Sequence, residues 1–181
     1  MVLVRTALAL LLTGCIKAGA PVVAPSSVDV ASTMSLGTID LAHGHALPEG
    51  LALTVREVLA TRRLNLRPLQ APQDFKTRQS TAHRLNWLAS QNGGAPILLL
   101  IELQAERYDN MGGRFRWVVD VKLSLAAQAD PAQAQVTEFS VPVHLGHAHD
   151  DATAAVAASL PMLRRRLAAA LDSHLAGASA P

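Results

Sequence analysis

The stretch PILLLIELQAERYDNMGGRFRWVVDVKLSLAA, residues 96–127, decides the fold of this chain. Two arms, 96–108 and 114–127, flank the segment 109–113, whose Asp, Asn and Gly residues are typical of a turn. In the second arm apolar residues recur at every second position from Phe115 to Leu125, and polar or charged residues fall between most of them. This alternation predicts an antiparallel hairpin with one face buried and one face in water.

A third strand is predicted over 136–145, where the same alternation continues. Phe139, Val141, Val143 and Leu145 share the predicted inner face. Pro142 has no backbone N–H to donate, so this strand is expected to lie at an edge of the sheet or to contain a β-bulge.

The remaining elements follow from the spacing of apolar residues. Strands are expected over 34–41 and 65–69, and helices over 48–63, 74–91 and 151–175. The predicted fold is α+β, in the order β-α-β-α-β-β-β-α, with a mixed, largely antiparallel sheet and its helices packed on one face.

The N-terminus has the three-part pattern of a secretory signal. Arg5 precedes an apolar stretch over 6–12, and small residues follow at Thr13 and Gly14. A bilayer-spanning helix needs about 20 apolar residues, so this segment is expected to be removed rather than to span.

The tetrapeptide Leu12-Thr13-Gly14-Cys15 resembles the lipobox of bacterial lipoproteins. The resemblance implies cleavage before Cys15 and acylation of that cysteine, which anchors the chain to a membrane through two or three acyl chains. In that family an aspartate after the cysteine retains the protein in the inner membrane, whereas Ile16 follows here. We therefore expect an outer-membrane lipoprotein facing the periplasm.

The domain organisation follows from these segments. We expect a signal peptide over 1–14, a lipidated flexible tether over 15–33, a single domain over 34–176 and a disordered tail over 177–181. The 167 residues after the predicted cleavage site suit one domain with its tether.

The turn and strand Gly94-Ala95-Pro96-Ile97-Leu98-Leu99 give the domain a further resemblance. With the meander and last helix that follow, the domain resembles periplasmic accessory lipoproteins, such as activators of penicillin-binding proteins, and the α/β domains of curli-secretion proteins. The resemblance implies an accessory role, although a shared fold does not establish a shared function.

No sequence motif of a known catalytic centre is present. The chain lacks the G-x-S-x-G, H-E-x-x-H, G-x-x-x-x-G-K and G-x-G-x-x-G patterns, and it has one cysteine. We therefore expect neither an enzyme nor a resident cofactor. The formal net charge of +2 is too small to indicate a nucleic-acid partner.

Two histidine-rich segments favour an alternative role. Two imidazoles that are two residues apart in an extended segment point the same way and could bind zinc or copper. Alternatively, these histidines are simply polar residues at strand ends. The candidate ligands are His43, His45, His144, His147 and His149.

The exposed face of the predicted sheet carries a candidate partner-binding site at Arg114, Arg116 and Lys122. Charged strand faces are also found simply in contact with water. Three hypotheses therefore remain open: an envelope accessory protein that binds a partner machine, a periplasmic metal or small-ligand binder, and a hydrolase of unrecorded type.

Overall fold

The computed structural model describes residues 27–37, 47–70, 75, 80–112, 114–147 and 150–178. These residues form three helices and five strands in the predicted order. The elements are β1 (Val28–Gly37), α1 (Glu49–Ala60), β2 (Leu64–Pro68), α2 (Thr81–Gln91), β3 (Ile97–Met111), β4 (Arg114–Ala127), β5 (Asp130–Leu145) and α3 (Ala152–Ala178).

The strands form one open, mixed sheet in the order β2-β1-β3-β4-β5. β1 pairs in parallel with both β2 and β3, whereas the β3–β4 and β4–β5 pairs are antiparallel. The α+β class and the mixed sheet are confirmed, and the long hairpin lies where the alternation predicts it. β5 is an edge strand, as Pro142 indicates.

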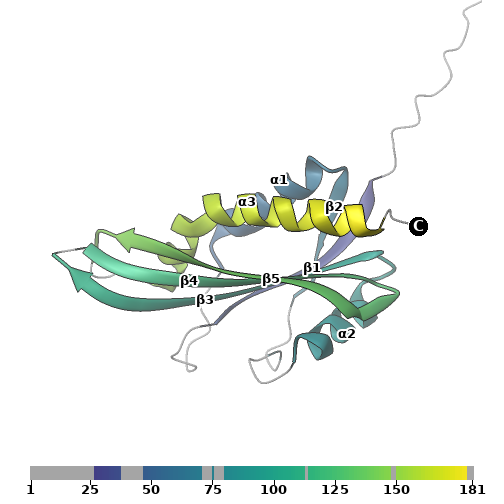
Figure 1. The fold of residues 1–181 in the computed structure, drawn as a ribbon, viewed down its shortest axis with the longest axis horizontal. Coiled ribbons are helices and arrows are strands. Elements are labelled where there is room, and N and C mark those ends of the chain that lie inside the picture. Colours follow the sequence, from purple (N-terminus) through teal and green to yellow (C-terminus); the bar gives the residue numbers. More distant parts are fainter. Residues whose placement is uncertain are drawn as a thin grey trace, which may run out of the picture.

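One face of the sheet is covered by α1 and α3, which lie together above it in Figure 1. The main core fills this interface with Leu99, Ile101, Trp117 and Val119 from the strands and Leu163 from α3, among others. Asp151 caps the N-terminus of α3, because its carboxylate accepts a hydrogen bond from the Ala154 N–H at 2.9 Å.

α2 lies on the opposite face, so the prediction that the helices share one face holds for α1 and α3 only (Figure 1). Its Leu85 and Leu88 pack on Ala31, Leu98 and Leu100, which alternate with the residues of the main core. The strand order explains this placement. The crossover from β1 to β2 and the crossover from β2 to β3 run in opposite directions across the sheet, and crossovers of one hand then place their helices on opposite faces.

Several predicted boundaries are wrong. β1 begins at Val28, so residues 28–33 belong to a central strand and not to a tether. α2 begins at Thr81, because the Ser80 hydroxyl accepts a hydrogen bond from the His83 N–H and caps the helix there. α3 continues to Ala178 and includes the first two residues of the predicted tail.

Within the part of the chain that the structure describes, no helix combines the length and the apolar character needed to cross a bilayer.

Candidate functional site

The face that carries α2 is covered by a described helix at one end only (Figure 1). The register of the sheet arranges its exposed residues in rows across the strands. Ser35, Glu102, Lys122 and Glu138 form one row, and Gln104, Asp120 and Ser140 form the next. Both rows are polar, whereas the row under α2 holds Ala31, Leu98 and Ala126.

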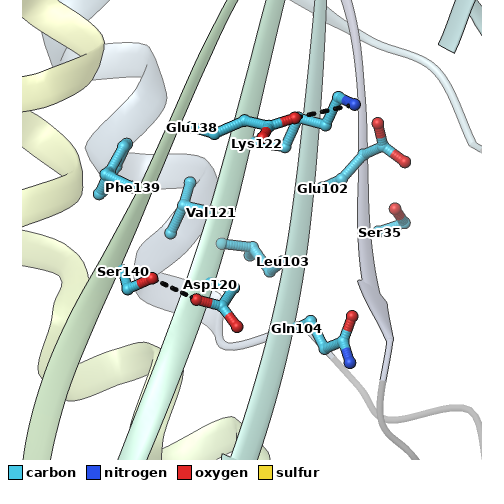
Figure 2. A pocket seen from close by; sticks show the side chains of 10 residues that line it. All are labelled: Ser35, Glu102, Leu103, Gln104, Asp120, Val121, Lys122, Glu138, Phe139 and Ser140. Atoms are coloured by element: carbon cyan, nitrogen blue, oxygen red, sulfur yellow. Dashed lines mark hydrogen bonds and ion pairs between the residues drawn. The ribbon is translucent and has the colours of Figure 1, made fainter.

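These two rows form an open groove of about 340 Å³. Figure 2 shows their side chains along four neighbouring strands, from Ser35 on β1 to Glu138 and Ser140 on β5. Because pairing fixes the register of these strands, the donors and acceptors of the groove start from backbone positions with a fixed spacing.

The charges of the groove are largely compensated by neighbouring side chains. Lys122 Nζ lies 3.0 Å from a carboxylate oxygen of Glu138, and the Ser140 hydroxyl donates a hydrogen bond to Asp120. Arg84 of α2 lies at the edge of the groove, with its guanidinium 2.6 Å from Glu102. The groove therefore combines three carboxylates with two cations, which leaves a small acidic excess.

The predicted partner-binding residues do not form one site. Lys122 lies in the groove and is paired with Glu138. Arg116 lies farther along the same face, directly opposite His144 of β5, and Arg114 lies at the hairpin turn. Only the two arginines are near each other, because they occupy alternate positions at the same end of β4.

The hairpin end has an aromatic residue that the sequence analysis did not single out. Tyr108 is 70% exposed, and the Arg116 guanidinium lies 5.7 Å from the centroid of its ring. On the other face, the Arg107 guanidinium lies 4.2 Å from the centroid of the Phe115 ring. We call Arg107, Tyr108, Arg114 and Arg116 the tip surface.

The predicted metal ligands fall partly outside the described residues. His43, His45 and His149 lie there, as does the predicted lipidation site Cys15. His144 lies on β5 and His147 follows it. Among the residues that the structure describes, no group of three or more His, Cys, Asp or Glu side chains could hold a metal ion.

Two residues of the groove, Ser35 and Gln104, were not assigned to the exposed face from the sequence. The first was missed because its row depends on the pairing of β1 with β3. The second lies between Glu102 and Glu106 in the alternation of β3, which is the sequence signal that could have identified it.

No protein-family model and no curated protein matches the chain. Solved structures with a similar fold include the PelC dodecamer from Paraburkholderia phytofirmans, with 15% sequence identity and a TM-score of 0.46 over 79% of this chain and 88% of that chain. They also include lipoprotein GNA1162 from Neisseria meningitidis, with 11% identity and a TM-score of 0.40 over 83% and 99% of the two chains. The rare lipoprotein B from Shewanella oneidensis is similar at 15% identity, with a TM-score of 0.28 over 81% and 93%.

Proposed function

We propose that this protein is a lipid-anchored accessory protein of the bacterial outer membrane, which faces the periplasm and binds a protein of an envelope machine without catalysing a reaction. Such a machine would serve cell-wall synthesis, secretion or outer-membrane assembly. The observation that carries the binding role is the polar groove on the half of the sheet that α2 leaves uncovered.

The groove is better suited to bind a protein than to enclose a small molecule. It is open and crosses four neighbouring strands. Its lining combines carboxylates, hydroxyls, an amide and an ammonium group with the apolar residues Leu103, Val121 and Phe139. Strand pairing already orders the backbone that carries these groups, so that backbone loses little conformational freedom when a partner binds, which favours affinity. A partner segment with several hydrogen-bond donors would match the acidic excess.

The anchor rests on the sequence Leu12-Thr13-Gly14-Cys15. Acylation of Cys15 would hold the domain at the membrane surface, where a partner in the same envelope is at a high effective concentration. Modest affinity in the groove is then sufficient for the two proteins to associate.

The anchor is tested by substituting Cys15→Ser and labelling cells with a fatty-acid analogue. Serine cannot accept the acyl group from the lipoprotein pathway, so we expect label in the wild type and none in the variant. Equal labelling of the two proteins would overturn the proposed anchor.

The binding role is tested by photo-crosslinking in cells. A photoreactive amino acid replaces Gln104, which is exposed in the groove, or Leu53, which is exposed on α1 outside it. We expect a discrete crosslinked product with an envelope protein from position 104, reduced by a second substitution, Asp120→Arg, and absent from position 53. A product pattern that is the same from both positions would exclude the groove as the contact.

A further inference from the structure

We infer that the tip surface is a second contact region, which binds an acidic segment of the partner protein at the end of the domain farthest from the membrane anchor. This inference rests on the proposed function, because it names the chemistry of the partner at a second place on the same molecule. Four observations carry it: charge, exposure, aromatic character and position.

The charge of the hairpin end differs from that of the groove. Residues 107–116 contain three arginines and one carboxylate, Asp109. No ion pair joins Arg107, Arg114 or Arg116 to another side chain that the structure describes, whereas Lys122 and Arg84 in and beside the groove both have one. Asp109 is the register partner of Arg116 on β3, so three positive charges stand against one negative charge at this end, and the excess favours contact with an anion.

Exposure and aromatic character make the tip surface suitable for a protein contact. All three arginines and Tyr108 are exposed. Among the large hydrophobic residues that the structure describes, Tyr108 is the most exposed. Its ring fixes one side of the Arg116 guanidinium. Arginine and tyrosine are enriched at interfaces, because a planar guanidinium binds carboxylates at two points and the tyrosine ring adds apolar area.

The position of the tip surface follows from the sheet register. β1 enters the sheet at Val28, close to the level where Val30 pairs with Ile97, and β3 then continues 14 residues to Met111. At about 3.3 Å per residue, the hairpin end lies roughly 46 Å along the strands from the entry point of the chain. Figure 1 shows this end projecting beyond the helices, opposite the C-terminal end of α3.

This distance favours a protein over a membrane as the partner that binds the tip surface. Twelve residues separate Cys15 from Val28, and a flexible chain of that length has a mean span of about 20 Å. With Cys15 as the proposed anchor, this chain length keeps the entry point close to the membrane, whereas the tip surface is the part of the described domain farthest from the entry point. Anionic lipid headgroups of the anchoring membrane fit this arrangement less well than an acidic protein segment farther into the periplasm.

The test measures binding of a fluorescent decaglutamate peptide to the full lipidated protein in zwitterionic nanodiscs. The tip variant is Arg114→Glu with Arg116→Glu. The matched control is Arg56→Glu with Arg165→Glu, which changes two exposed arginines on α1 and α3 and alters the net charge equally. Fluorescence anisotropy gives the affinity at low and high salt.

We expect the tip variant to bind decaglutamate about tenfold more weakly than the wild type, and the control to stay within about twofold. The affinity of the wild type should fall as salt rises, since the charges are exposed. Tyr108→Ser should weaken binding without changing this salt dependence.

Three results would overturn the inference. They are no binding by the wild type, equal losses in the tip variant and the control, and binding of the tip surface to phosphatidylglycerol vesicles in preference to decaglutamate. The proposed function fails separately, because it is judged by the acyl label on Cys15 and by crosslinking from position 104, neither of which involves the tip surface.

Discussion

The guanidinium of Arg84 lies 2.6 Å from the carboxylate of Glu102, and this contact joins α2 to β3 at the boundary between the part of the sheet that α2 covers and the part that no described helix covers. Arg84 is a buried residue of α2, and Glu102 belongs to the first row of the groove. The pair therefore ties α2 to the sheet beside the polar face.

Glu102→Gln should destabilise the domain, because the buried Arg84 guanidinium loses its charged partner. Hydrogen bonds to charged groups contribute about 1.5–3 kcal/mol, and we expect a loss in this range. Urea unfolding of the full chain measures it. The control is Glu138→Gln, which breaks the more exposed Lys122 pair and should cost no more than about 1 kcal/mol. Equal unfolding midpoints for the two variants would show that Arg84 does not depend on Glu102.

Trp117→Ala should destabilise the domain far more than Arg116→Ala. The indole is 8% exposed in the main core, whereas the neighbouring arginine is exposed. The expected losses are about 3–5 kcal/mol for the buried aromatic side chain and at most about 0.5 kcal/mol for the arginine. Urea midpoints give both values.

A second substitution at the same position separates packing from hydrogen bonding. The buried Trp117 Nε1 donates no hydrogen bond to the described residues, so Trp117→Phe loses apolar volume and no hydrogen bond. We expect it to retain much more stability than Trp117→Ala. A loss as large as that of the alanine variant would indicate a partner for the indole N–H.

Gly93→Ala should destabilise the end of α2. Gly93 follows Asn92, the C-cap residue of α2, and has a φ of +58°. A residue with a Cβ loses about 1–2 kcal/mol of stability in this left-handed conformation. An added Cβ would also overlap the Arg67 guanidinium, which donates a hydrogen bond to the Gly93 carbonyl. Gly146→Ala is the control, because nothing lies within 4 Å of the Cβ position there. Thermal unfolding should show a lower midpoint for Gly93→Ala only.

Stability should fall at acidic pH through the ion pair between Arg62, which lies just after α1, and Asp172 of α3. The hydrogen bond from the Arg62 guanidinium lowers the pKa of Asp172 below its ordinary 3.8. Because the folded-state pKa is the lower one, the contribution of Asp172 is complete above pH 3.8 and is lost as the pH falls through the folded-state value. Asp172→Asn should therefore lower the urea midpoint near neutral pH, and its difference from the wild type should shrink progressively as the pH falls below 3.8. A difference that persists at low pH would assign the effect to something other than this carboxylate.

The sequence by itself determined the element order and the inner face of the long strands. Alternation in residues 114–127 and 136–145 identifies the main core, because a strand places successive side chains on opposite faces. The same alternation places Asp120 and Glu138 on the outward face. The five consecutive apolar residues Ile97–Ile101, followed by alternation from Glu102, are the sequence sign that the start of β3 is covered on both faces.

The tertiary structure alone decided the order of the strands, and with it the face on which α2 packs. The spacing of apolar residues predicts a helix, but it does not tell which strands that helix connects in the sheet. The sequence analysis therefore placed α2 on the wrong face. The separation of Lys122 from Arg114 and Arg116 has the same origin. All three residues alternate correctly along β4, but their partners are set by neighbouring strands: Glu138 of β5 lies beside Lys122, and His144 of β5 lies beside Arg116. Pairing between distant segments is a property of the assembled sheet, because it depends on which strand lies beside which and in what register.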